Sequence, residues 1–252
     1  MTRRLRLDQL CVERGLAPTR HKAQALILAG QVLVDDHPVS KAGSQIADDA
    51  ALRLRGEAPR YVSRGGLKLE ALLEACQLDV NAMVALDVGA STGGFTDCLL
   101  QHGAEHVIAV DVGYGQLAWK LRSDPRVTCV ERQNARYLDR AALSAIPDEL
   151  WPPKVASIDV SFISLTLVLP AIAALIGGDN PLLCLVKPQF EATREEIGKH
   201  GVIRGEGRKR AIDKVLYWAK EAGYTVDCEL DCPLPGPKGN VEFLVQLRTP
   251  KD

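Results

Sequence analysis

The chain has 252 residues, of which 46% are hydrophobic, and its formal net charge at pH 7 is -1. This length suits one catalytic domain of common size and a small accessory domain, and the composition is that of a globular protein. Because the total charge is close to zero, a nucleic-acid-binding surface has to come from local clusters of basic residues and not from the chain as a whole.

The cysteines and the apolar stretches limit the class of protein further. Seven cysteines are scattered without a CxxC pair, which indicates neither a zinc site nor a disulfide framework and fits a reducing cytoplasm. The longest apolar stretch, Leu165 to Ile176, is too short to span a bilayer and contains Pro170. We therefore expect a cytoplasmic protein without a metal, a secretion signal or a membrane partner.

Residues 1–58 predict a small α+β module. Apolar residues at helical spacing predict short helices at Leu7 to Val12 and at Arg20 to Ala29. Alternating valines around Asp35-Asp36-His37-Pro38 predict a β-hairpin, and a further strand is expected at Ala51 to Leu54. Basic residues gather in this part of the chain, at Arg3, Arg4, Arg6, Arg14, Arg20 and Lys22.

A second domain is expected at residues 67–252, after a linker at residues 59–66 that contains Pro59 and Gly65-Gly66. Short apolar strands separated by helix-length stretches predict a doubly wound α/β sheet. These strands are expected at Val84 to Val88, Val107 to Asp111, Val127 to Val130, Val155 to Asp159, Leu182 to Val186 and Val241 to Leu247.

A glycine-rich loop follows the first of these strands, with Asp87 before it and glycines at Gly89, Gly93 and Gly94. Such a turn lets the backbone approach a ligand closely, at the amino end of the next helix. The spacing does not fit the dinucleotide pattern G-x-G-x-x-G and suits S-adenosylmethionine better. Asp111 ends the second strand, where a carboxylate can bind ribose hydroxyls. The alternative is a glycine turn that serves helix packing only.

Four charged residues are candidates for the chemistry: Lys68, Asp159, Lys187 and Glu242. Three of them lie in or at the ends of apolar strands, where a charge is costly without a partner or a task. A ribose 2′-hydroxyl is a poor nucleophile, so its methylation needs a base or a cation that stabilises the developing alkoxide. Two lysines flanked by two carboxylates supply such groups. Taken one at a time, each residue is also explained by a structural ion pair.

The chain resembles the TlyA family of ribosomal RNA cytidine-2′-O-methyltransferases over nearly its whole length. The resemblance rests on the amino-terminal module, on Arg60-Tyr61-Val62-Ser63-Arg64-Gly65-Gly66-Leu67-Lys68-Leu69, on the glycine loop and on Lys187-Pro188-Gln189-Phe190-Glu191. It implies an FtsJ-like catalytic domain with a seven-stranded, mostly parallel sheet, whose Lys-Asp-Lys-Glu tetrad falls on Lys68, Asp159, Lys187 and Glu242. It also implies cofactor contacts at Gly89, Gly93, Phe95, Asp111 and Asn134, with Phe95 where the FtsJ pattern has Trp and Asn134 where it has Asp.

The resemblance also implies that the amino-terminal module is an S4 domain that binds ribosomal RNA through phosphate contacts. The residues expected to do so are Arg4, Arg6, Arg20, Lys22, Arg60 and Arg64, and Arg204, Arg208, Lys209 and Arg210 could extend the basic track. The short tail after Leu247 is similar to the shorter members of the family and favours the large-subunit RNA as target. Two other functions are weighed against this one: a non-catalytic RNA-binding factor of ribosome assembly, and a hemolysin-like membrane-active protein.

Overall fold

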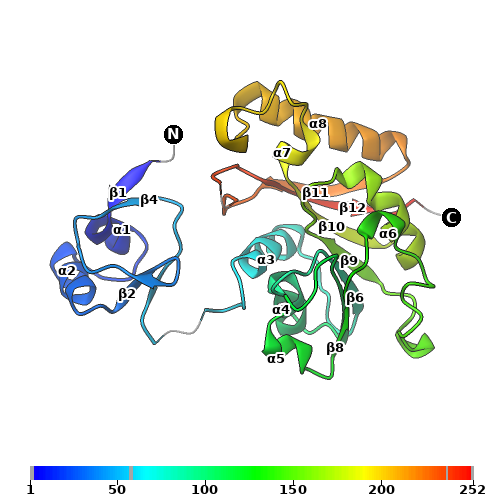
Figure 1. Ribbon diagram of the computed structural model, residues 1–252, viewed down its shortest axis with the longest axis horizontal. Helices are drawn as coiled ribbons and strands as arrows, with labels where there is room; N and C mark the ends of the chain where they lie inside the picture. Colours follow the sequence, from blue (N-terminus) through cyan, green and yellow to red (C-terminus); the bar gives the residue numbers. More distant parts are fainter. Residues whose placement is uncertain (1–2, 57–58, 237, 251–252) are drawn as a thin grey trace. The chain divides into compact units, whose positions relative to one another are not determined.

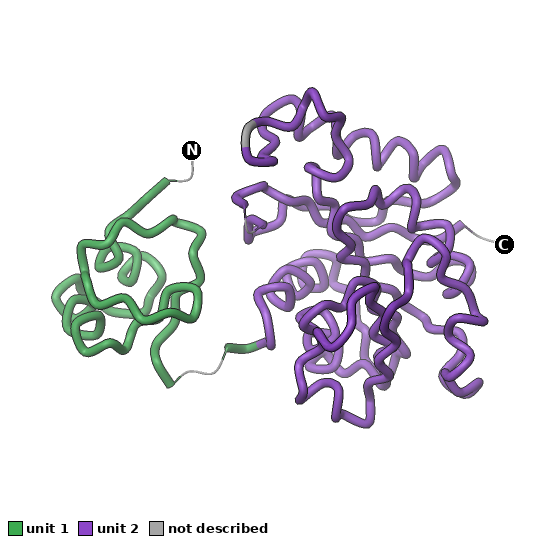
Figure 2. Tube along the Cα trace, viewed as in Figure 1, with its two compact units in different colours: residues 1–60 green, residues 61–252 purple. Residues whose placement is uncertain are grey.

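The chain forms two compact units, residues 1–60 and 61–252, in a computed structural model that describes residues 3–56, 59–236 and 238–250 (Figure 2). Glu57 and Ala58, at the expected end of the first domain, lie outside the described residues. The expected linker is divided between the units, with Arg60 in the first and Tyr61 in the second.

The first unit packs two helices on short strands. The helices are α1 (Leu7–Glu13) and α2 (Arg20–Leu28), and the strands are β1 (Arg4–Arg6), β2 (Val32–Val34), β3 (His37–Pro38), β4 (Gln45–Ala47) and β5 (Leu52–Leu54). Strand β2 lies between β3 and β5, and β1 pairs with β4. Leu7, Cys11 and Ile27 are fully buried between these elements and form the core with Val32.

Two details of the first unit differ from the sequence-based expectation. The hairpin turn consists of Asp35 and Asp36 alone, because His37 and Pro38 already belong to β3. Both aspartates have positive φ, 48° and 67°, as a two-residue turn between antiparallel strands requires. The pair of β1 and β4 was not predicted, since a three-residue strand with two arginines carries no apolar alternation.

The second unit contains a seven-stranded sheet in the order β11-β12-β10-β9-β6-β7-β8. Strands β10, β9, β6, β7 and β8 run parallel, whereas β12 is antiparallel to both of its neighbours. The doubly wound, mostly parallel sheet predicted from the sequence is confirmed. Its strands are β6 (Val84–Val88), β7 (His106–Val110), β8 (Val127–Val130), β9 (Val155–Ile158), β10 (Pro181–Val186), β11 (Thr225–Asp231) and β12 (Phe243–Arg248).

Helices cover both faces of this sheet (Figure 1). On one face, α3 (Gly65–Cys76) and α4 (Gly94–Gln101) bury a leucine-rich core, with α5 (Trp119–Arg122) beside them. On the other face, α6 (Leu169–Ile176) and α8 (Gly205–Glu221) pack against alternate residues of the same strands. A single turn, α7 (Pro188–Glu191), follows β10 after Lys187. Burial on both faces explains why the central strands are continuous apolar runs.

Strand β11 was not predicted, because the strands expected in this domain were continuous apolar runs and the residues of β11 instead alternate between charged and apolar types, as in a half-buried strand. Asp227, Glu229 and Asp231 are exposed, and Val226, Cys228 and Leu230 are half-buried. This strand lies at the edge of the sheet, and the side chains on one of its faces remain in water. Its pairing with β12 shifts between Val226 and Cys228, which leaves Asp227 as the extra residue of a bulge.

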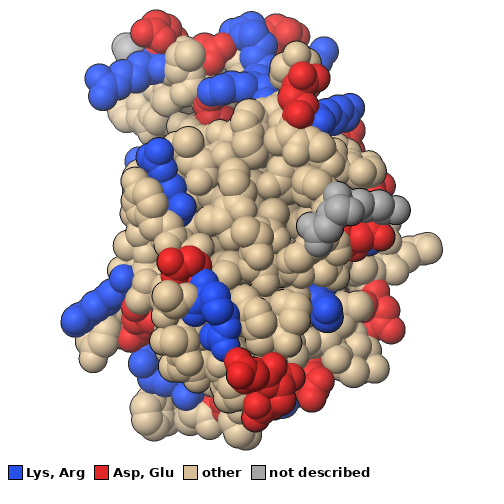
Figure 3. All heavy atoms as spheres, turned by 90° about the vertical axis from the view of Figure 1, so that its right-hand side faces the viewer, with Lys and Arg blue, Asp and Glu red and all other residues tan. Residues whose placement is uncertain are grey.

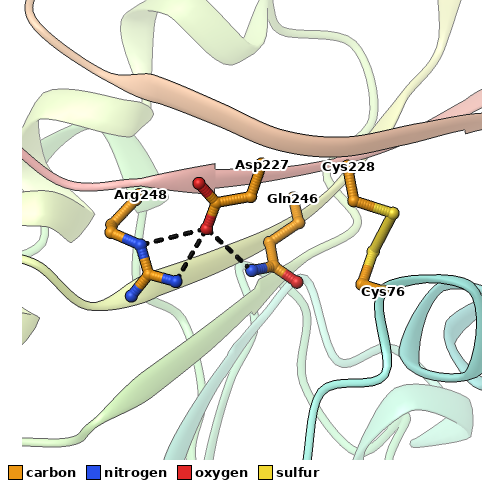
Figure 4. Close-up of a disulfide and its surroundings, with 5 residues drawn as sticks. All are labelled: Cys76, Asp227, Cys228, Gln246 and Arg248. Carbon is orange, nitrogen blue, oxygen red and sulfur yellow. Dashed lines mark hydrogen bonds and ion pairs between the residues drawn. A yellow bond between two sulfur atoms is a disulfide. The ribbon is translucent and has the colours of Figure 1, made fainter.

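Cys76 of α3 and Cys228 of β11 form a disulfide, with their Cα atoms 5.7 Å apart (Figure 4). The expectation that the cysteines form no disulfide was wrong for this pair. The two residues are 152 positions apart in the chain, so no local spacing indicates the bond. Beside it, Asp227 accepts hydrogen bonds of 3.0 Å from Gln246 Nε2 and Arg248 Nε, which hold the bulge in place.

Charged side chains of both signs lie close together on the face shown in Figure 3, around a mostly uncharged centre. This mixture agrees with the formal net charge of -1. Within the part of the chain that the structure describes, no helix combines the length and the apolarity needed to cross a membrane.

The Cys76–Cys228 bond closes a long loop, so its removal should destabilise the second unit. We expect Cys228→Ser to lower the free energy of unfolding by about 2–4 kcal/mol, because the cross-link restricts the unfolded chain. Urea unfolding without reductant measures the difference, and the same comparison in excess dithiothreitol is the control, in which both proteins should unfold alike. Equal stability without reductant would contradict the prediction.

Candidate active site and cofactor cavity

Three of the four candidate catalytic residues lie where β9, β10 and β12 meet at one edge of the sheet. Asp159 directly follows β9, Lys187 directly follows β10, and Glu242 directly precedes β12. Because β12 is antiparallel to β10 and Val186 pairs with Phe243, the next step of this register places Lys187 opposite Glu242. In open α/β sheets, the carboxyl ends of the parallel strands are where ligands bind.

The two lysines and the two carboxylates form two close ion pairs. Lys187 Nζ lies 2.5 Å from Asp159 Oδ1. Lys68 Nζ, which comes from the first turn of α3, lies 2.5 Å from Glu242 Oε2. Glu242 is only 1% exposed and Lys68 only 8%, so each charge depends on its partner. Helix α3 begins at Gly65, so it includes the last two residues of the expected linker.

The register of β10 and β12 joins the two pairs, because Lys187 lies opposite Glu242 and each of them is paired with one of the other two residues. The structure therefore brings together the four residues that the sequence singled out. Cys232 lies beside them, since its N–H donates a hydrogen bond of 3.0 Å to the carbonyl oxygen of Glu242. Burial raises the pKa of the Cys232 thiol to about 11.

A cavity of about 460 Å³ adjoins the cluster. Its lining includes Gly89, Asp111 and Asn134, three of the predicted cofactor contacts, and it also includes Asp159. The cavity thus reaches from the end of β7 to Asp159, the partner of Lys187. Several of its polar or aromatic lining residues were not predicted, because they lie in loops without a spacing pattern: Ser91, Gln116, Gln133, Ser161 and Phe162.

Asp111 is held in place by the backbone of two loops. Its Oδ2 accepts a hydrogen bond of 2.8 Å from the N–H of Ser91, and its Oδ1 accepts one of 2.6 Å from the N–H of Gly113. Each oxygen can accept a second hydrogen bond, so the carboxylate can still bind a pair of hydroxyl groups. Asn134 is oriented through its Oδ1, which accepts a hydrogen bond of 3.0 Å from the N–H of Arg136.

Gly89 permits a close approach between the backbones of two parallel strands. It has φ +84°, and a Cβ there would lie 2.4 Å from the carbonyl oxygen of Asp159. Glycine at this position therefore keeps β6 and the start of the loop after β9 in contact, and this contact sets where Asp159 lies.

The other predicted cofactor residues of the glycine loop do not line the cavity. A Cβ at Gly93 would lie 2.3 Å from the side chain of Leu121, and one at Gly94 would lie 2.2 Å from Ser63 Oγ. Phe95 is 3% exposed within the core of α3 and α4. Close packing against neighbouring side chains is therefore sufficient to explain why glycine or phenylalanine occupies these three positions. Their role in cofactor binding stays a prediction.

Asp87 is also fully buried and outside the cavity lining. Its carboxylate accepts hydrogen bonds from Thr96 Oγ1 at 2.6 Å and from Ser157 Oγ at 2.7 Å, which link β6 to α4 and β9. Burial raises the pKa of Asp87 to about 6. The residue thus supports the base of the glycine loop.

In the first unit, a buried aspartate organises two of the predicted RNA-binding arginines. Asp8 is fully buried, and its Oδ2 lies 3.0 Å from Arg6 Nη2 and 3.1 Å from Arg20 Nη2, while Gln24 Nε2 donates a hydrogen bond of 2.8 Å to the same oxygen. Hydrogen bonds from Arg6 hold the pKa of Asp8 well below its usual range. The side chains of Arg6 and Arg20 remain 42% and 51% exposed, so part of each guanidinium can contact a phosphate.

The remaining predicted RNA-binding residues lie apart from Asp8. Arg4 is exposed on β1, as Lys22 is on α2. Arg60 ends the first unit, and Arg64 precedes α3 in the second. Arg6 lies in β1, directly before α1.

The fold and the site are those of an α/β enzyme of the kind that binds a nucleotide-like cofactor at the ends of its strands. A cluster of two lysines and two carboxylates adjoins the cavity. Residues 61–249 match the model of the FtsJ-like methyltransferases, and residues 5–50 match the S4 domain. The chain belongs to the FtsJ-like methyltransferase family and carries an S4 domain.

Several relatives resemble the chain over nearly its full length. It is 45% identical to the 16S/23S rRNA (cytidine-2′-O)-methyltransferase TlyA of Mycobacterium tuberculosis, over 100% of this chain and 92% of the relative. It is 46% identical to YqxC of Bacillus subtilis, which is named as an rRNA methyltransferase, over 97% and 86%. A solved structure from Streptococcus thermophilus that carries a hemolysin name shares 43% identity and a TM-score of 0.75, over 99% of this chain and 90% of that one.

The family assignment confirms three expectations from the sequence. These are the resemblance itself, the α/β methyltransferase fold preceded by an S4 domain, and S-adenosylmethionine as the cofactor. The roles of the individual site residues rest on the geometry above.

Replacement of Gly89 tests the close approach between the two strands. We expect Gly89→Ala to lower the free energy of unfolding by about 2 kcal/mol more than Gly223→Ala, since both positions have a similar positive φ but only Gly89 meets a backbone atom. Gly223 has φ +86°, and a Cβ there would lie 3.5 Å from the Pro250 side chain. Urea unfolding of both variants measures the difference. Equal losses of unfolding free energy in the two variants would show that the positive φ accounts for the whole effect and that the close contact at Gly89 does not contribute.

Replacement of Asp87 tests its buried charge. Its pKa is about 6 in the folded chain, against an ordinary value of 3.8, so the folded state binds the proton more tightly than the unfolded state. This carboxyl group therefore makes the protein less stable as the pH rises from about 4 to 6, by on the order of 3 kcal/mol. We expect this loss to be absent in Asp87→Asn.

Urea unfolding at several pH values between 4 and 7 measures the two slopes. Asp213→Asn removes an exposed carboxylate of α8 and should keep the slope of the unmodified chain. If the unfolding free energy of Asp87→Asn and that of the unmodified chain changed with pH in the same way, the raised pKa of Asp87 would be contradicted.

Proposed function

We propose that this protein transfers the methyl group of S-adenosylmethionine to the 2′-hydroxyl of a cytidine in 23S ribosomal RNA. The observation that carries the proposal is the contact between the cavity and the cluster: Asp159 lines the cavity and also pairs with Lys187. The relative from Mycobacterium tuberculosis is named for 2′-O-methylation of cytidine in 16S and 23S rRNA. Mapping both RNAs decides whether small-subunit RNA is a second substrate.

The residues of the cavity fit S-adenosylmethionine. Its volume of about 460 Å³ lies within the range of sites for small molecules and cofactors. Asp111 would hold the ribose hydroxyls, Asn134 offers its side-chain amide to the same cavity, and the backbone at Gly89 can come close to the ligand because the residue has no side chain. When bound, this cofactor supplies a methyl group on an electrophilic sulfonium sulfur.

The charged cluster would activate the ribose oxygen. The ammonium group of Lys187 can donate a hydrogen bond to the 2′-oxygen and so stabilise the negative charge that develops there as the methyl group is transferred. Asp159 forms an ion pair with Lys187 and can accept the proton that the hydroxyl group loses. Lys68 and Glu242 form a buried ion pair next to Lys187 and Asp159. The ammonium group of Lys68 would be a second cation near the ribose oxygen, and the carboxylate of Glu242 balances its charge.

The first unit would hold the RNA. Arg6 and Arg20, oriented by Asp8, present N–H groups that suit phosphate oxygens, and Arg4 and Lys22 add charge on the same unit. Contacts of this kind place the enzyme on the RNA but do not read its sequence. We place the reaction in the cytoplasm, on ribosomal subunits.

The function is tested with the purified protein, methyl-labelled S-adenosylmethionine and ribosomal subunits from cells that lack the protein. We expect label at a cytidine 2′-oxygen of 23S RNA, located by nucleotide-resolution mapping. Lys187→Ala should slow transfer at least about 100-fold, because it removes the group that stabilises the alkoxide, while cofactor binding measured by calorimetry stays unchanged.

Lys154→Ala is the matched control. Lys154 is exposed and directly precedes β9, so it lies at the end of the strand opposite to Asp159, and its loss should not change the rate. Full activity of Lys187→Ala would refute the proposed mechanism. A protein that binds subunits but neither binds the cofactor nor transfers label would instead be an RNA-binding assembly factor.

A further inference from the structure

The loop after β9 touches the segment after β10 at three successive points. Lys187 Nζ contacts both Asp159 and Ser161, at the first point. The rings of Phe190 and Phe162 then lie 5.0 Å apart, and Glu191 binds Ser164 and Leu165. The contacts follow the same order along both segments, so the position of the loop is coupled to the position of Lys187.

Glu191 anchors the far end of this contact. It is 3% exposed, and its carboxylate accepts hydrogen bonds from Ser164 Oγ at 2.5 Å and from the N–H of Leu165 at 2.8 Å. A buried carboxylate is costly unless hydrogen bonds compensate for the lost water. Glu191 therefore holds the turn η3 (Leu165–Leu167) and fixes where the loop ends.

Ser161 lies at the other end of the loop and is a second acceptor for Lys187. The distance from Lys187 Nζ to Ser161 Oγ is 2.8 Å, a normal hydrogen bond. The contact of the same ammonium group with Asp159 Oδ1, at 2.5 Å, has the distance of an ion pair but not the angles of a hydrogen bond. Ser161 thus supplies directional control that Asp159 does not.

We propose that Ser161 is a positioning residue for the methyl transfer, because its hydroxyl group orients the ammonium group of Lys187. A lysine side chain has several rotatable bonds, and one ion pair leaves the direction of its N–H groups open. Ser161 fixes the direction of one N–H of Lys187, and the ion pair with Asp159 keeps the ammonium group in place, so that another N–H can point to the ribose oxygen. Glu191 supports this arrangement through the loop.

This inference rests on the proposed function, and one other role for Ser161 has to be separated from it. Ser161 also lines the cavity, so its hydroxyl group could instead contact the cofactor. The two roles predict different kinetics. A positioning role lowers kcat and leaves cofactor affinity intact, whereas a cofactor contact weakens the binding of S-adenosylmethionine.

The kinetic test compares Ser161→Ala, Ser161→Thr and Ser144→Ala. Ser161 is exposed, so its replacement should not affect folding, and Ser144 is an exposed serine outside the cavity lining that serves as control. We expect Ser161→Ala to lower kcat roughly tenfold with unchanged KM for subunits and unchanged Kd for S-adenosylmethionine, as the loss of a hydrogen bond to a charged group implies. Ser161→Thr should restore most of the rate. Weaker cofactor binding in proportion to the lost rate would overturn the proposal.

The coupling to Glu191 is tested by a double-variant cycle. If Glu191 acts through the loop on Ser161, Ser161→Ala combined with Glu191→Gln should be little slower than the slower single variant. If the double variant were slower by the product of the two separate reductions in kcat, the two residues would act independently, and this coupling would be contradicted.

A measurement without substrate separates this proposal from the function itself. In protein labelled with ¹⁵N-lysine, the Lys187 ammonium signal, assigned by its loss in Lys187→Arg, should be visible in the unmodified chain and broadened in Ser161→Ala by faster exchange with water. An unchanged signal in Ser161→Ala would refute the positioning role even if the methyl transfer is confirmed. Failure of the methyl transfer alone would refute the proposed function and leave this measurement valid.

Discussion

Each lysine of the candidate site lies 2.5 Å from a carboxylate oxygen, and this pairing is the constraint on which the rest of the site depends. An ammonium group in a buried position without a partner would be strongly destabilising. Lys68 can therefore be buried only where α3 lies against the start of β12, because its partner Glu242 is there. The fold of the second unit and the chemistry of its site are fixed by the same contacts.

Helix α3 is attached to this edge of the sheet at both of its ends. Lys68 and Cys76 are separated by about 12 Å of helix, and Glu242 and Gln246, which pairs with Cys228, are separated by about 13 Å of strand. Since the two lengths agree, the helix and β12 run side by side, with an ion pair at one end and a disulfide at the other. Neither attachment has to distort the helix to form.

The central strands and the charged cluster could be predicted because local sequence carries their signal. Strands buried on both faces are apolar throughout, so a charge at the end of such a strand, as at Asp159 or Lys187, stands out. The edge strand β11 lacks that signal, since one side of it faces water. The role of each glycine could not be predicted either, because a positive φ at Gly89 and at Gly93 permits both a ligand and a close helix contact.

Other parts of the site depend on contacts between distant segments, which a single sequence does not reveal. Cys76 and Cys228 come together only when β11 joins the sheet. Ser161 is one serine in a loop of mixed composition, and its contact with Lys187 requires that β9 and β10 be neighbours. The Lys187–Glu191 motif was recognised, but its contacts with the loop after β9 became visible only in three dimensions.

The buried carboxylate of Asp8 has a consequence for the thermodynamics of RNA binding. If Arg6 and Arg20 bind phosphates as proposed, they would lose less side-chain entropy than unrestrained arginines, because Asp8 already holds them. The anion between them also cancels part of their charge, so fewer counterions would leave the RNA than the number of basic side chains suggests. Affinity at this surface would owe more to preorganised geometry than to net charge, and it would weaken less steeply as salt concentration rises.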